Sequence, residues 1–242
     1  MNKIGTLDII KAYLGNKELS ANNAYIGEIP LINAPIIDDR LRFEALEDNS
    51  VIGLAQKSTV YSVLQYSLDG DNWNDLTTSS SITMNTGDQL FIRGKMTSNG
   101  SRDIYNNFSI SGKVEVKGKI MYIYDYENIE SNIVYTYTFR RLFYNCSGLI
   151  DAKNLIFPDT LPTQCCASMF NNCDNLLYAP ALTATSIGNS CYNYMFENCT
   201  SLTTVPSNML PATTLALYCY SYMFYNCSSL TSAPELPATT LA

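Results

Sequence analysis

The chain has 242 residues, of which 46% are hydrophobic, 12% aromatic and only 15% charged, so it can bury a core and is too apolar to be disordered. Its net charge of −7, with no cluster of basic residues, disfavours general binding to nucleic acid or to an anionic membrane. The absence of His removes the Ser-His and Cys-His nucleophile pairs and the commonest nitrogen ligand of metals. These features favour a folded protein without catalytic activity, metal or cofactor.

Targeting signals are weak along the whole chain. The first fifteen residues carry a polar residue every two or three positions and lack the apolar stretch of a secretory signal. No later segment approaches the roughly 20 apolar residues of a membrane helix. We therefore expect synthesis in the cytoplasm without membrane insertion, and we expect the eight Cys to stay reduced.

The first fifty residues contain a short internal repeat. Ala12–Gly15 recurs as Ala24–Gly27, twelve residues later, which indicates strand-turn-strand elements; a helix ending at Gly15 is an alternative. Such Tyr-(Leu/Ile)-Gly elements resemble the N-terminal segments of phage tail and fibre proteins. The resemblance implies that residues 1–50 attach the protein to a virion and to its own copies, unless they pack on the next module as an extra strand pair. The expected contact residues are Tyr13, Leu14, Tyr25 and Ile26.

Residues 51–120 show the alternation and turn punctuation of strands. The strand-like runs are Val60–Ser67, Ser81–Met84, Gln89–Arg93 and Lys113–Lys117, separated by turns rich in Asp, Asn and Gly. Short runs of this kind predict a small antiparallel β-sandwich.

The acidic turn Asp69–Asp75 has the composition of a calcium-binding loop. An EF-hand would need an oxygen ligand at Trp73, a Gly at Asn74 and a Glu at Ser80, so that site is excluded. The turn instead predicts a hairpin, with an adventitious cation as the alternative. Every Gly-Lys pair in the chain is followed by an apolar residue where a phosphate-binding loop requires Ser or Thr, so no nucleotide site is expected.

The last hundred residues repeat one unit. Leu142–Cys146 (Leu-Phe-Tyr-Asn-Cys) returns as a Met-Phe-x-Asn-Cys motif ending at Cys173, Cys199 and Cys227, in steps of 27, 26 and 28 residues. A period of this length predicts a solenoid. We expect the repeated Cys to form a ladder of buried core residues, with disulfides or a metal as alternatives. The ladder consists of Cys146, Cys165, Cys173, Cys191, Cys199, Cys219 and Cys227.

Within one unit, Cys191, Met195 and Cys199 are spaced i, i+4, i+8, which predicts an amphipathic helix. Leu202–Val205 is rich in β-branched residues and predicts a short strand. Leu210–Ala216 supplies a Pro turn and Thr residues that could cap the next helix. One repeat is therefore predicted as strand, turn and helix.

These elements predict a modular protein of mixed α+β class. Its expected parts are a strand-rich attachment segment at 1–50, an antiparallel β-sandwich at 51–120, a connector and N-terminal cap at 121–141 and a leucine-rich-repeat-like solenoid at 142–242. Arg140 and Arg141 are expected to give the first repeat a polar end. Leu236–Ala242 matches Leu210–Ala216, so the array is expected to continue beyond Ala242.

The repeats resemble a known family. The motifs Met-Phe-x-Asn-Cys-x-Ser-Leu and Leu-Pro-Ala-Thr-Thr-Leu-Ala in Leu142–Ala242 resemble the BspA-like leucine-rich repeats of bacterial surface proteins, in the form found in Bacteroides and its phages. The resemblance implies a non-enzymatic phage structural protein, a head or tail fibre of the crAss-like type, located in the virion. Its implied partners are other virion proteins, one or two further copies of itself as a dimer or trimer, and a host-surface glycan or protein. A bacterial cell-surface adhesin is the alternative, and a glycan-active enzyme is a third reading.

Tyrosine is abundant, with eighteen in the chain. On the repeats, Tyr194 and Tyr222 fall outside the apolar stripe and can offer a flat apolar face with a polar tip to a sugar or a protein. Covering the flank of the repeats is their alternative role. The expected receptor contacts are Tyr194, Tyr222, Thr203 and Thr231.

Overall fold

The computed structural model describes residues 38–100, 102–103, 105–130 and 134–241, together with the backbone of 25–26 and 29–30. The chain divides into two compact units, Met1–Asp39 and Arg40–Ala242.

In the first unit, β1 (Tyr25–Ile26) pairs antiparallel with β2 (Ile29–Pro30). The other two expected contact residues, Tyr13 and Leu14, lie outside the described residues, as do the side chains of Tyr25 and Ile26.

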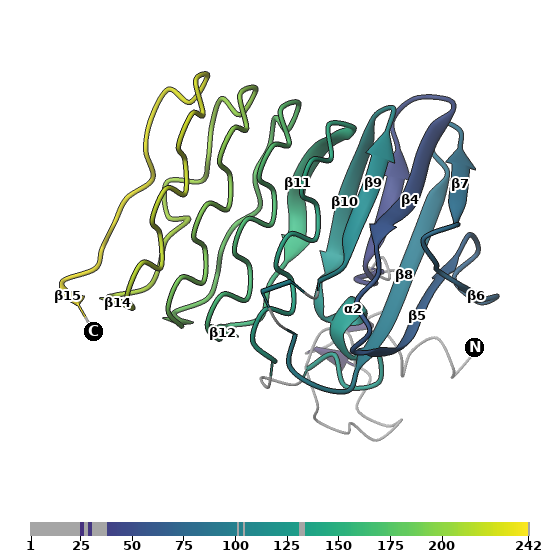
Figure 1. The fold of residues 1–242 in the computed structure, drawn as a ribbon, viewed down its shortest axis with the longest axis horizontal. Coiled ribbons are helices and arrows are strands. Elements are labelled where there is room, and N and C mark those ends of the chain that lie inside the picture. Colours follow the sequence, from purple (N-terminus) through teal and green to yellow (C-terminus); the bar gives the residue numbers. More distant parts are fainter. Residues whose placement is uncertain are drawn as a thin grey trace. The chain divides into compact units, whose positions relative to one another are not determined.

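Two sheets form the first half of Arg40–Ala242 (Figure 1). Six strands make up the larger sheet, in the order β11 (Leu149–Ile156), β10 (Val114–Lys119), β3 (Arg42–Ala45), β8 (Gln89–Met96), β5 (Tyr61–Ser67) and β6 (Asn74–Asp75). The smaller sheet has the order β7 (Ser81–Met84), β4 (Ser50–Gln56) and β9 (Asn107–Ser111). The sheets pack through their apolar faces, where the rings of Phe43 and Phe108 meet edge to face at 4.9 Å between centroids.

The strands β5, β7, β8 and β10 coincide with the four strand-like runs of the sequence. Strand β3 lies before the expected start of the module, yet it pairs with both β10 and β8 inside the larger sheet. The β module therefore begins by Arg42, so the expected attachment segment at 1–50 includes a strand of that module.

The acidic turn closes an antiparallel hairpin between β5 and β6, as predicted. Asp69 organises the turn, because its carboxylate accepts the backbone N–H of Asp71 at 2.9 Å and of Asn72 at 2.7 Å. These hydrogen bonds hold the pKa of Asp69 well below its usual range.

The predicted mixed α+β class is wrong. Within the described residues the chain is built from strands and turns, and its one helix is the single turn α2 (Met121–Tyr124). The expected helix at Cys191–Cys199, and with it the helix-containing leucine-rich-repeat-like solenoid, is overturned by the backbone angles. Ser190, Tyr194 and Asn198 have φ values of +53°, +57° and +61°, and a residue in this left-handed region at every fourth position interrupts any α-helix.

Four segments share this conformation, and we call them coils 1 to 4: residues 137–145, 164–172, 190–198 and 218–226. Along coil 3, alternate N–H groups close turns three residues back, as Met195 does to the Tyr192 carbonyl at 3.1 Å. The N–H groups between them donate to the next coil, as Phe196 does to the Met223 carbonyl at 2.9 Å. Both kinds of backbone donor are thus satisfied without a helix, and the coils stack in register.

Side-chain ladders reinforce the stack. The rings of Phe143, Phe170, Phe196 and Phe224 lie nearly parallel, at 5.3 to 5.7 Å between successive centroids. Successive Asn side chains are also bonded, since the Asn172 amide donates to Asn145 at 2.8 Å. The same bond recurs from Asn198 to Asn172 and from Asn226 to Asn198.

Short parallel strand pairs link the coils at their other edge. Strand β12 (Thr160–Leu161) pairs with β13 (Ser186–Ile187), and β14 (Thr214–Leu215) pairs with β15 (Thr240–Leu241). Of the two Thr residues in Leu210–Ala216 that were expected to cap a helix, Thr214 lies in β14, whose extended backbone suits a β-branched side chain.

The first coil does not present a polar end to water, contrary to the prediction. The larger sheet continues into the repeats, because β11 pairs in parallel with β10. Arg140 is buried, and it lies with Arg141 on the wall of a groove that crosses the coils.

Candidate functional site

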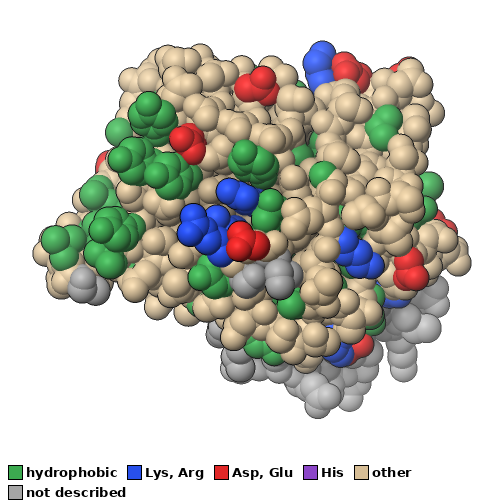
Figure 2. All heavy atoms as spheres, viewed as in Figure 1, with side chains coloured by type: hydrophobic (Ala, Val, Ile, Leu, Met, Phe, Trp, Pro, Cys, Tyr) green, Lys and Arg blue, Asp and Glu red, His purple; other side chains and the backbone are tan. Residues whose placement is uncertain are grey.

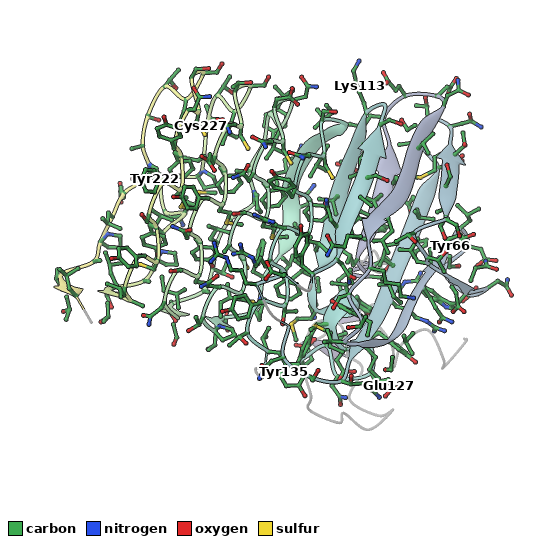
Figure 3. The ribbon with its side chains drawn as sticks, in the orientation of Figure 1. Tyr66, Lys113, Glu127, Tyr135, Tyr222 and Cys227 are labelled. Carbon is green, nitrogen blue, oxygen red and sulfur yellow. The ribbon has the colours of Figure 1, made fainter. Side chains whose placement is uncertain are left out.

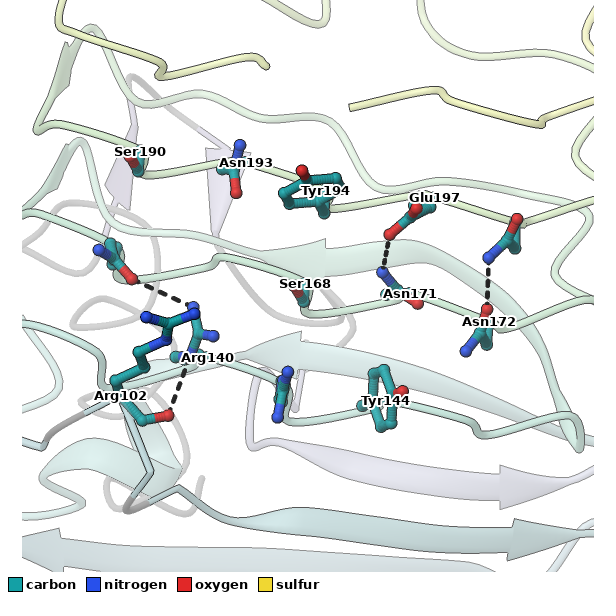
Figure 4. A pocket seen from close by; sticks show the side chains of 13 residues that line it. Arg102, Arg140, Tyr144, Ser168, Asn171, Asn172, Ser190, Asn193, Tyr194 and Glu197 are labelled. Atoms are coloured by element: carbon teal, nitrogen blue, oxygen red, sulfur yellow. Dashed lines mark hydrogen bonds between the residues drawn. The ribbon is translucent and has the colours of Figure 1, made fainter. Parts of the chain in front are cut away.

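A polar groove of about 520 Å³ crosses coils 1 to 3 (Figure 4). Its position follows from one column of residues: Arg141, Ser168 and Tyr194 occupy equivalent places in successive coils, each with φ near +55°. The small Ser168 stands between two large side chains, so the surface is hollow at coil 2. The two walls are separated by two strand spacings, or roughly 10 Å.

Three arginines line one end of the groove: Arg102, Arg140 and Arg141. Arg140 is held from two sides, because its Nε donates to the Arg102 carbonyl at 3.3 Å and its Nη1 donates to the Gln164 side chain at 3.1 Å. Arg141 donates from Nη1 to the Tyr105 hydroxyl at 3.2 Å. The cationic groups are therefore positioned by neutral partners.

No carboxylate neutralises this cluster within the described part of the chain, where none of the three arginines takes part in an ion pair. Burial lowers the pKa of Arg140, and the nearby charges of Arg141 and Arg102 lower it further. Glu197 also lines the groove, but its carboxylate accepts a hydrogen bond from the Asn171 amide. The cluster is a concentrated positive charge on an acidic protein.

Aromatic rings stand on both walls. Tyr144 lies on coil 1, with the Arg141 guanidinium 5.1 Å from its ring centroid. Tyr194 lies on coil 3 and stacks on Tyr222 of coil 4 at 4.9 Å, with 6° between the ring planes. In Figure 4, Tyr144 and Tyr194 lie on the two outer rows of chain, with Ser168 and Asn171 on the row between them. Stacking fixes the Tyr194 ring before any ligand arrives.

The structure separates the four expected receptor contacts into two places. Tyr194 lines the groove and Tyr222 continues its column on coil 4. Thr203 and Thr231 are exposed but do not line the groove, and the Thr231 N–H and hydroxyl both donate to the Thr203 carbonyl.

The sequence interpretation missed the arginine wall. Arg140 and Arg141 depart from the later repeats, which carry Ala167-Ser168, Asn193-Tyr194 and Ser221-Tyr222 at the equivalent positions. We interpreted that departure as a cap, although it also marks the one coil that can supply positive charge to the surface of the stack.

The cysteines lie away from this groove. All seven ladder residues and Cys166 are buried and unpaired. The Cys173 thiol donates to the Phe143 carbonyl at 2.9 Å, and Cys199 and Cys227 repeat this contact with the Phe of the preceding coil. Burial raises the pKa of these thiols, to about 11 for Cys227, which opposes their use as nucleophiles.

A second surface, at coil 4, has a different character. Large apolar side chains are exposed there, and Figure 2 shows hydrophobic side chains gathered toward the end that carries β14 and β15. They include Leu217, Tyr218, Tyr222, Tyr225, Leu236 and Leu241. This surface offers mainly an apolar contact, whereas the groove combines charge, amides and rings, so the groove has the more specific ligand chemistry.

The described residues lack two further features. They contain no group of three Cys, Asp or Glu side chains arranged to hold a metal ion. They contain no helix long and apolar enough to cross a membrane.

No protein-family model, curated protein or solved structure matches the chain. The function is therefore inferred from the residues and geometry of the groove.

Proposed function

We propose that the protein is a non-enzymatic adhesion protein that binds a surface glycan through the groove across coils 1 to 3. The observation that carries the proposal is the groove itself, which combines guanidinium and amide donors with the rings of Tyr144 and Tyr194 on its two walls. Sugars are recognised by planar polar side chains together with aromatic faces, since a pyranose has hydroxyl edges and an apolar C–H face.

We further propose a place for the protein in a virion, as a head or tail fibre. The resemblance of the Met-Phe-x-Asn-Cys motif to BspA-like repeats of phages supports this placement. In this proposal the unit Met1–Asp39 binds other virion proteins and sister copies in a dimer or trimer, while Arg40–Ala242 displays the groove. A bacterial cell-surface adhesin would use the same groove from a different anchor.

Binding is tested with the full chain on arrayed bacterial surface polysaccharides. We expect saturable binding to a subset of glycans without release of reducing ends, and we expect loss of binding in Tyr194→Ala. The matched control is Tyr225→Ala, which removes an exposed Tyr outside the groove. A folded protein that binds no glycan would refute the proposal, and release of reducing ends would favour a glycan-active enzyme.

Anchoring is tested by deletion of residues 1–39. A deletion to residue 50 would remove β3 from the middle of the larger sheet and would confuse loss of anchoring with loss of the fold. We expect particles assembled with the shorter deletion to lack the protein while the purified variant retains its glycan binding. Normal copy number on the particles would refute the anchoring role, and labelling of host cell envelopes in place of particles would favour the adhesin.

A further inference from the structure

We propose that the ligand of the groove is an acidic oligosaccharide whose carboxylate or sulfate group binds between Arg140 and Arg141. This inference names the class of ligand of the proposed glycan site and rests on that proposal.

The groove carries an excess of positive charge. Three guanidinium groups face one carboxylate there, in a chain whose net charge is −7. Like charges held close together raise the free energy of the empty site, and partial burial strengthens the repulsion because it reduces screening by solvent. An anionic ligand removes this cost, whereas a neutral sugar leaves it in place.

The arginines keep unused hydrogen-bond donors. Arg140 uses Nε and Nη1, and Arg141 uses Nη1, so the Nη2 group of each has no hydrogen-bond partner among the described residues, whereas the Nε of Arg141 is buried out of a ligand's reach. A guanidinium matches a carboxylate or sulfate through paired N–H donors, and such charge-assisted bonds are about twice as strong as neutral ones. Arg140 is held by the Arg102 carbonyl and Gln164, so its orientation is fixed before the ligand binds.

The extent of the groove favours an acidic sugar over a simple anion. The arginines stand at one end of a groove that continues past Ser168 and Asn171 to Tyr194. A phosphate or sulfate ion would occupy the arginine end alone and leave the rings unused. A sugar residue that carries an oxyanion can place its charge at Arg140 and Arg141 and its ring against Tyr144, with the next residue reaching Tyr194.

The test uses probes that differ in charge but not in ring structure. An oligogalacturonide is compared with its methyl ester, which has the same rings without the carboxylate charge, and a carrageenan oligosaccharide, whose only charges are sulfate esters, is compared with its desulfated form. Inorganic polyphosphate serves as an anion without sugar rings. Affinities are measured by calorimetry with the full chain at two salt concentrations.

We expect at least one acidic oligosaccharide to bind tenfold or more tightly than its neutral partner, with a preference that weakens at higher salt. Arg141→Gln should remove most of that preference. Lys113→Gln removes the same charge from the turn between β9 and β10, labelled at the upper end of the strands in Figure 3, which does not line the groove, and should leave the affinity unchanged. Unfolding temperatures of both variants show whether the fold is kept.

The outcomes separate the two proposals. Preference for the carboxylate pair or for the sulfate pair identifies the oxyanion. Equal binding of charged and neutral partners overturns the acidic ligand but supports the glycan site. Binding of polyphosphate as tight as that of the sugars overturns the inference in favour of a general anion site. Absence of binding to every sugar by a folded protein overturns both proposals.

Discussion

Phe108 of β9 stands against Phe143 of coil 1 as the Phe of each coil stands against the next. The two rings are stacked at 5.8 Å with 18° between their planes. The Phe108 N–H donates to the Leu142 carbonyl at 2.9 Å, and the Cys146 thiol donates to the Phe108 carbonyl at 3.1 Å. A β-strand therefore supplies the backbone donor, the carbonyl acceptor and the ring of a preceding coil, so one strand joins the sheet to the stack.

Replacing Phe108 with Ala should destabilise the protein strongly, because the ring is 1% exposed and contacts both Phe43 and Phe143. We expect the free energy of unfolding to fall by about 3–5 kcal/mol, the usual cost of truncating a buried Phe. Phe224→Ala is the matched control, since Phe224 ends the same ladder and is only partly buried. Denaturant titration measures the free energy of unfolding of both variants. Equal losses would show that Phe108 stabilises the protein no more than the last ring of the ladder does.

The Asn ladder combines a side-chain hydrogen bond with a left-handed backbone. Asn172 has φ +60°, donates to Asn145 and accepts from Asn198. Asn172→Gly can still adopt this φ but loses both hydrogen bonds, so the free energy of unfolding should fall by about 1–3 kcal/mol. Asn172→Ala should cost roughly a further 1 kcal/mol, because an Ala is strained at this φ.

Chemical denaturation of the two Asn172 variants separates these contributions. If Ala and Gly destabilise equally, the backbone angle carries no cost. If neither destabilises the protein, the ladder contributes nothing to the stability of the stack.

The period of the repeat and four of the nine strands in the two sheets could be predicted from the sequence, while the backbone conformation of the repeat could not. Apolar residues at Cys191, Met195 and Cys199 fit a helix over two steps, yet a helical stripe should also use i+3 and i+7 positions. A strict spacing of four between apolar residues instead fits the observed coil, in which a residue with left-handed backbone recurs at every fourth position. Ser190, Tyr194 and Asn198 share that spacing, and of these only Asn has a marked preference for positive φ.

The groove was harder to predict than the repeat, because it depends on alignment between coils. The column of Arg141, Ser168 and Tyr194 is visible once the repeats are aligned, but its depth requires the coils to stack in register through bonds such as that of Ser168 N–H to the Asn193 carbonyl at 2.8 Å. Arg102 comes from outside the repeats and joins the groove through the tertiary fold alone.

Thiol reactivity should follow burial along the stack. Cys227 is 9% exposed and Cys219 is 3% exposed, whereas the ladder residues of coils 1 to 3 are fully buried. Alkylation of the native protein followed by peptide mass spectrometry should label Cys227 and Cys219 first and leave Cys173 and Cys199 protected. Denaturation without reductant should release eight reactive thiols. A smaller number would show that some cysteines are paired.

Stability should decrease at alkaline pH because burial raises the pKa of the ladder thiols. Burial is the main cause of the raised pKa of Cys146, Cys173 and Cys199. Below about pH 8.5, the ordinary pKa of Cys, both folded and unfolded chains keep their thiol protons and the full stability is present. As the pH rises further, the unfolded chain releases protons that the folded chain retains, so the free energy of unfolding falls.

For each thiol proton that the folded chain retains and the unfolded chain has released, the free energy of unfolding should fall by up to about 1.4 kcal/mol per pH unit. Urea titrations at pH 7, 8.5, 9.5 and 10.5 measure this slope. Cys173→Ala should reduce the slope by about one proton, while Leu176→Ala, at an equally buried position without a thiol, should lower the stability at every pH and keep the slope. If the slope is the same in Cys173→Ala and in the unchanged chain, Cys173 is not among the groups that make the fold sensitive to alkali.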